Sequence, residues 1–168
     1  HRDLHSFPTR RSSDLPNLSV TDNVIMKNYD QSPIGNGWTI NSPQAVGYAE
    51  KLKESYDIVV PSVNTSVRLL SGGNLQRVIL AREISSSPAL MVAVQPTRGL
   101  DVGAIEGVQR LLWAQRESGS GILLISEELE ELIALSDRIY VIYEGEIMGE
   151  MCQCDIEKIG LMMTGSRL

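Results

Sequence analysis

The sequence contains few of the residues that build disulfide frameworks, metal sites or membrane spans. Its 168 residues include 2 cysteines, 2 histidines and a single phenylalanine. The longest apolar runs, such as 89–94, are much too short to cross a bilayer. Cys152 and Cys154 are too few and too close together for a disulfide framework, and with so few possible partner ligands they do not make a metal site. These absences predict a reduced, cytosolic globular domain without a bound metal.

Positive charge is also scarce. The chain has 15 Lys and Arg residues against 21 Asp and Glu residues, a formal net charge of −6. Proteins that bind nucleic acid through its phosphates need clustered basic side chains. The charge balance therefore argues against a nucleic-acid partner, while 42% apolar and 21% charged residues are typical of a globular protein.

Residues 1–15 differ from the remainder of the chain. Both histidines and Phe7 lie there, the stretch begins without Met, and it shows no apolar period. The string resembles a one-frame translation of a sequencing-library adapter, so we expect a non-native leader. The alternative is a disordered basic tail; a twin-arginine signal is excluded because no apolar segment follows Arg10 and Arg11. Without the leader no histidine remains, which excludes mechanisms that need one.

The rest of the chain is expected to divide into a helical lobe (16–87), half of an α/β core (88–150) and a C-terminal tail (151–168). Apolar periodicity and capping signals predict five helices, at 21–26, 42–56, 75–87, 102–117 and 127–135. Continuously apolar or extended runs occur at 58–60, 89–94, 121–126 and 138–143, the last turning at 144–145 into 146–148. Alternation of apolar strands with helices predicts a parallel sheet covered on both faces.

The most informative loop is Ser71-Gly72-Gly73, which opens directly onto a helix. Backbone N–H groups at a helix start, with a serine hydroxyl beside them, can bind an anion. Taken alone, Ser-Gly-Gly is more often an ordinary flexible turn.

Three motifs that follow one another along the chain favour a functional role for this loop over an ordinary turn. Residues 70–77 (LSGGNLQR) resemble the signature motif of ABC-transporter ATPase cassettes, 95–101 (QPTRGLD) the end of Walker B with the D-loop, and 122–126 (ILLIS) the strand before the switch histidine. The resemblance implies the C-terminal part of a P-loop NTPase domain, with a parallel sheet core and a helical signature lobe. Residues 74–76 and 96–104 look like the second, degenerate cassette of two-cassette importers for simple sugars and nucleosides, and Gln95 resembles the nucleoside branch.

The departures from the family pattern concern the site that this cassette would itself carry. Walker B normally ends in Asp, which holds the Mg²⁺ hydration shell, and Glu, which orients water; here Val94 and Gln95 stand there. Glu127 replaces the switch histidine, although it is also an ordinary acid for the first turn of a helix. None of the four lysines follows a glycine, so the chain contains no P-loop and we expect it to be inactive alone.

The resemblance implies that two cassettes dimerise head to tail around ATP. Ser71, Gly72 and Gly73 would then contact the γ-phosphate of ATP, with Mg²⁺, held mainly by the partner cassette. Gln76 would touch the ribose or lie on an exposed helix face, and Asp101 would serve in the D-loop, cap a helix, or do both.

The implied partners are a second cassette, transmembrane permease subunits and, indirectly, a solute-binding protein, at the cytoplasmic face of the membrane. ATP hydrolysis would then drive import of nucleosides or simple sugars. The alternatives are a non-transport ABC-type ATPase of translation or repair, and a non-functional truncated reading frame.

Overall fold

The computed structural model describes residues 15–152 and 155–166, and these form two compact units that meet in sequence at Leu123 and Leu124. The leader expected at 1–15 lies outside the described residues except for Leu15, and Cys154 lies outside them too. The division into lobe, core half and tail stays a prediction. Within the described ranges, no helix is both long and apolar enough to cross a membrane.

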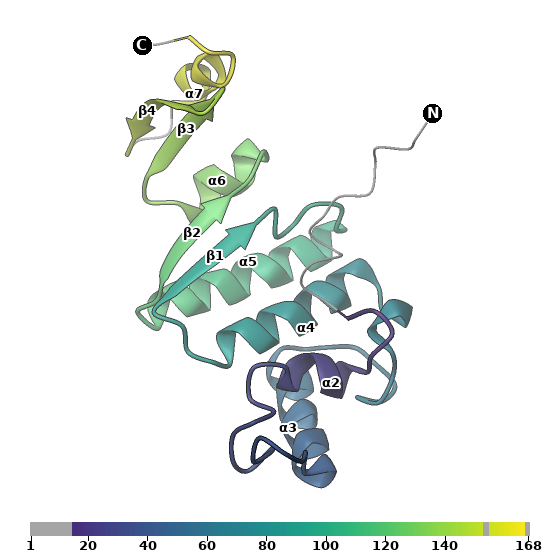
Figure 1. The fold of residues 1–168 in the computed structure, drawn as a ribbon. Coiled ribbons are helices and arrows are strands. Elements are labelled where there is room, and N and C mark those ends of the chain that lie inside the picture. The colour runs from purple at the N-terminus through teal and green to yellow at the C-terminus, as the bar shows by residue number, and fades with distance from the viewer. Residues whose placement is uncertain (1–14, 153–154, 167–168) are drawn as a thin grey trace. The chain divides into compact units, whose positions relative to one another are not determined.

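The first unit contains mainly helices, and Figure 1 shows their order along the chain. The elements are α2 (Val20–Ile25), α3 (Ser42–Ser55), a 3-10 turn (Val67–Leu69), α4 (Gly72–Ile84), β1 (Leu90–Val94) and α5 (Val102–Glu117). Strand β2 (Gly121–Ile125) begins in this unit and continues past its last residue, Leu123. The predicted helices 42–56 and 102–117 are thereby confirmed to within a residue. Asn41 caps α3 through a hydrogen bond to the Gln44 N–H, and a proline occupies its first turn, as the local sequence predicts.

Helix α2 begins at Val20, one residue before the predicted start at residue 21. Ser19 is the N-cap: its hydroxyl oxygen accepts from the Asp22 N–H, and the Asp22 carboxylate accepts from the Ser19 N–H. This reciprocal pair is a capping box, in which the acid stands three residues inside the helix. Asp22 therefore contributes to the cap as the acid at the third helical position, whose carboxylate accepts from the backbone of the N-cap residue.

Helices α2, α3 and α4 pack around one apolar core, and α4 also contacts α5. The core contains side chains from along residues 20–81, among them Val20, Ala49, Val63, Val67 and Val78. The segment 58–60, predicted as a short extended run, forms no strand with any other described residues. Its side chains still alternate as in extended chain, because Ile58 and Val60 are buried and Val59 is exposed.

Strands β1 and β2 are neighbours in a parallel sheet, and Figure 1 shows them running in the same direction beside α5. Met91 and Ala93 are buried, whereas Leu90, Val92 and Val94 are 63%, 55% and 44% exposed. The prediction that both faces of the sheet are covered is therefore wrong for the described residues. An apolar run makes a strand suitable for burial on both faces, but burial needs a second layer to be present.

The second unit is a hairpin with two helices: α6 (Leu129–Leu135), β3 (Ile139–Tyr143), β4 (Glu146–Met151) and α7 (Ile156–Met163). Glu144 and Gly145, both with positive φ, form the tight turn that joins the antiparallel strands, as predicted at 144–145. Helix α7 lies in the segment predicted only as a C-terminal tail, and it packs on the hairpin through Ile159 and Met162.

Candidate functional site

The signature segment forms the N-terminus of α4. Ser71 is the N-cap, with extended backbone, and its hydroxyl oxygen accepts from the Asn74 N–H at 3.4 Å. The N–H groups of Gly72 and Gly73 belong to the first helical turn, where no intrahelical acceptor is available. Ser71 is exposed, Gly72 is half-buried and Gly73 is buried. The start of α4 therefore presents a hydroxyl group and the positive end of the dipole of a 13-residue helix. Together these attract an anion.

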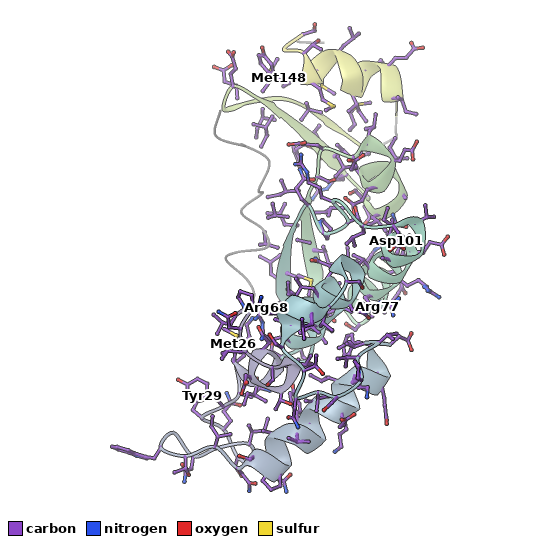
Figure 2. The ribbon with its side chains drawn as sticks, turned by 90° about the vertical axis from the view of Figure 1, so that its right-hand side faces the viewer. Met26, Tyr29, Arg68, Arg77, Asp101 and Met148 are labelled. Carbon is purple, nitrogen blue, oxygen red and sulfur yellow. The ribbon has the colours of Figure 1, made fainter. Side chains whose placement is uncertain are left out.

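The structure brings the predicted D-loop residue to this helix start. A Cβ atom added at Gly73 would lie 2.6 Å from the Cβ of Ala104, so α4 and α5 touch at their N-terminal turns. Asp101 is the N-cap of α5 and accepts from the Ala104 N–H at 3.0 Å. Figure 2 labels Asp101 at the start of α5 and Arg77 on α4. The capping role of Asp101 is thereby shown, and its role in a D-loop stays a prediction.

Val94 and Gln95 lie where β1 ends and the chain turns toward α5. Val94 is 44% exposed, and Gln95 has a φ of 49°, the left-handed region that few side chains adopt. The Arg98 N–H donates to the Gln95 carbonyl at 3.3 Å, and the Leu100 N–H donates to the Thr97 carbonyl at 3.1 Å. Two successive turns thus connect the strand to α5.

This strand end does not suit Mg²⁺. The cation needs oxygen ligands, usually carboxylates, and the Val94 side chain has none. In the described ranges, no group of three or more His, Cys, Asp or Glu residues could hold a metal. Cys152 is a free, exposed thiol.

Glu127 lies before a helix and not in its first turn, which corrects the predicted bounds of 127–135. Helix α6 begins at Leu129, and the Ser126 hydroxyl accepts from the Glu128 N–H at 3.0 Å. Glu127 is exposed, as a solvated acid would be, but Glu131 is only 4% exposed. The glutamates of this segment therefore do not all face solvent, because a packed helix turns some of its positions inward.

Gln76 is half-buried on α4, which leaves both of its predicted roles open. Asn74 is not among the predicted site residues, yet it makes three hydrogen bonds at the start of α4. An asparagine three residues after a capping serine is the signal that could have indicated it, because its short amide can reach back to the cap.

Comparison with solved structures places the fold among ATP-binding cassettes. A dimeric cassette in a post-hydrolysis state bound to ADP and Pi superposes with a TM-score of 0.67 at 23% identity, over 82% of this chain and 58% of that chain. A nucleotide-free cassette from an ABC transporter gives a TM-score of 0.67 at 22% identity, over 90% and 61%. The chain therefore has the fold of the C-terminal part of a P-loop NTPase domain of the ABC type, as predicted.

Sequence relatives identify the family. The chain is 48% identical over 159 residues to the glucose import ATP-binding protein TsgD13 of Haloferax volcanii, which covers 92% of this chain. It is 42% identical over 149 residues to the guanosine import ATP-binding protein NupO of Bacillus subtilis and 36% identical over 152 residues to the xylose import ATP-binding protein XylG of Thermoanaerobacter pseudethanolicus, covering 88% and 89% of this chain. No protein-family model matches. The chain belongs to the ATP-binding cassettes of ABC transporters, and it spans about 30% of the length of these relatives.

Proposed function

We propose that this chain is part of the ATP-binding subunit of an ABC importer for nucleosides or simple sugars. Its signature segment completes an ATP site whose P-loop belongs to another cassette, and its own site binds nucleotide without turnover. The relatives, named for import of glucose, guanosine and xylose, support the importer. They do not favour a non-transport ATPase of translation or repair.

The observation that carries the proposal is the contrast between two places in the first unit. At the start of α4, the exposed Ser71 hydroxyl and the first-turn amides offer donors for a phosphate. At the end of β1, Val94 offers no metal ligand, and Gln95 offers no base, since an amide cannot accept a proton at neutral pH. The site shared with the other cassette therefore has the hydrogen-bond donors that it needs from this chain. The site of this cassette lacks the catalytic acid and the metal-binding acid.

Assembly follows from the same proposal. A second cassette supplies the P-loop, with Mg²⁺ bound on its side, and transmembrane permease subunits hold the pair at the cytoplasmic face of the membrane. A solute-binding protein takes part indirectly. Gln76 faces the ribose of the shared nucleotide, and Asp101 touches the partner cassette in addition to capping α5.

The test is the ATPase activity of the complete protein that contains this chain. Ser71→Ala should lower kcat by about 100-fold, because it removes one donor to transition-state charge, whereas Gln95→Glu should change kcat less than about twofold. Wild-type turnover in Ser71→Ala would refute the proposal, and so would a large gain in Gln95→Glu.

A matched control separates chemistry from helix capping. Ser19 caps α2 as Ser71 caps α4, at a helix outside the proposed site. Each alanine variant should lower the free energy of unfolding by about 1 kcal/mol, but only Ser71→Ala should lose ATPase activity. Equal loss in both variants would show that capping alone explains the effect.

A further inference from the structure

The side chain of Asn74 lies between Ser71 and the backbone of Val59 and is hydrogen-bonded to both. Its Nδ2 atom donates to the Ser71 Oγ atom at 3.1 Å, and the Val59 N–H donates to its Oδ1 atom at 2.8 Å. The backbone N–H of Asn74 also donates to Ser71 Oγ, at 3.4 Å. Asn74 therefore approaches the Ser71 hydroxyl with two donors.

These contacts determine the hydrogen-bonding role that is left to Ser71. A primary amide has one acceptor oxygen and two N–H donors on its nitrogen, and a hydroxyl oxygen has two lone pairs. Since the Val59 N–H requires the amide oxygen, the amide nitrogen must face Ser71. Both lone pairs of the Ser71 oxygen then accept from Asn74. The hydroxyl therefore has no free lone pair, and its hydrogen is left to donate to a group other than Asn74.

The Val59 N–H that orients the amide is itself well held. Ile58 and Val60, on either side of it, are buried in the apolar core that α2, α3 and α4 surround. Two residues earlier, the Asp57 carbonyl accepts from Arg77 Nη1 at 2.5 Å, so α4 holds this segment at a second point. Asn74 therefore connects the Ser71 hydroxyl to a fixed backbone.

We propose that Asn74 is a positioning residue for phosphate recognition: it holds the Ser71 hydroxyl as a donor aimed outward, toward the γ-phosphate of ATP bound by the partner cassette. This inference rests on the proposed function, because it needs that phosphate to lie beside Ser71. Asn74 acts through Ser71 and does not touch the nucleotide. A donor already oriented before the reaction stabilises developing charge without reorganisation.

The decisive substitution is Asn74→Asp in the complete protein. The carboxylate can still accept from the Val59 N–H, but it presents an acceptor to Ser71 where the amide presented a donor. The Ser71 hydroxyl would then donate to the new carboxylate and no longer to phosphate. We expect kcat to fall at least about 10-fold, with the KM for ATP changed by less than about threefold and the melting temperature little altered.

A double-mutant cycle shows whether Asn74 acts through Ser71. If it does, the Ser71→Ala/Asn74→Asp variant is no slower than Ser71→Ala, because the hydroxyl that Asn74 orients is already absent. Losses that multiply in the double variant would overturn the assignment, since they would show an independent role for Asn74. Wild-type kcat in Asn74→Asp would overturn it as well.

Asn64→Asp is the control for the added negative charge, because Asn64 is exposed in the loop before the 3-10 turn and lies outside the site. Its kcat should equal that of the wild type; a loss equal to that of Asn74→Asp would overturn the assignment. The two proposals fail in different ways. If Ser71→Ala keeps wild-type turnover, the proposed function fails, whereas loss in Ser71→Ala with full activity in Asn74→Asp removes only the role of Asn74.

Discussion

Gly73 and Ala104 touch across the contact between α4 and α5, so closely that a Cβ atom at Gly73 would lie 2.6 Å from the Ala104 Cβ atom. The glycine is required here by a neighbouring helix as well as by any phosphate that approaches its N–H. The same contact brings the capping residues Ser71 and Asp101 to neighbouring helix starts. Two independent reasons therefore favour glycine at residue 73: the close contact with Ala104 and access of a phosphate to the N–H group.

The Gly73→Ala substitution should lower the free energy of unfolding by about 1–3 kcal/mol, because the added methyl group overlaps Ala104. Adding Ala104→Gly should restore most of that loss by removing the clashing Cβ atom. Urea unfolding of the two single variants and the double variant measures this coupling. Additive losses in the double variant would show that the two Cβ positions do not meet.

Substitutions at Asp101 can separate its shown role as a cap from its proposed role in the D-loop. Asp101→Asn keeps an oxygen that can accept from the Ala104 N–H, so stability should stay within about 0.5 kcal/mol, whereas Asp101→Ala should cost about 1 kcal/mol. If the D-loop role holds, both variants lose ATPase activity in the complete protein. Full activity in the stable Asn variant would leave Asp101 as a cap only.

The lowered pKa of the Glu83 carboxyl group predicts that the stability of the protein depends on pH. Partial burial of Glu83 would raise the pKa of the carboxyl, but hydrogen bonds from Lys27 and Arg82 outweigh burial and lower that pKa. A carboxyl with a lowered pKa contributes stability above its ordinary pKa and loses it as the pH falls through the lowered value.

Lys27→Met should therefore lower the free energy of unfolding by about 0.5–1 kcal/mol near neutral pH, a modest amount because the pair is partly exposed. The difference from the wild type should disappear as the pH falls below the ordinary glutamate range. Thermal melts from about pH 7 down to about pH 3 measure it. Lys51→Met, at an exposed position of α3, is the control; a pH-independent loss in Lys27→Met would refute the ion pair as its cause.

Glu131 offers a prediction of opposite sign. It is 4% exposed, and neither carboxylate oxygen has a hydrogen-bond partner among the described residues. An unpartnered buried polar group costs about 1–3 kcal/mol, so Glu131→Leu should raise the free energy of unfolding of this chain. Glu130→Leu, at an exposed position of the same helix, should change it by less than about 0.5 kcal/mol. A destabilised Glu131→Leu variant would show that the carboxylate has a stabilising partner.

Several features could be predicted from the sequence because they depend on neighbours along the chain. Helix α3 has a proline in its first turn, and α5 begins directly after its N-cap Asp101, as the capping preference predicts. The turn at Glu144 and Gly145 follows from the positive φ that glycine allows. The family motifs were also visible, since each is a short run of residues in a fixed order.

Other features depended on packing between distant segments. Nothing local indicates that Gly73 meets Ala104, that Glu131 turns inward while Glu127 is exposed, or that one face of β1 is bare. The contact of Asn74 with Val59 joins residues 15 positions apart.

By itself the sequence determined most of the helices and strands and their order, the family, and the absence of acidic side chains at Val94 and Gln95, because each of these is read from consecutive residues. Only the tertiary structure decided how the Ser71 hydroxyl is held. Its orientation depends on hydrogen bonds whose donors and acceptors come together when the segment around Val59 packs against α4.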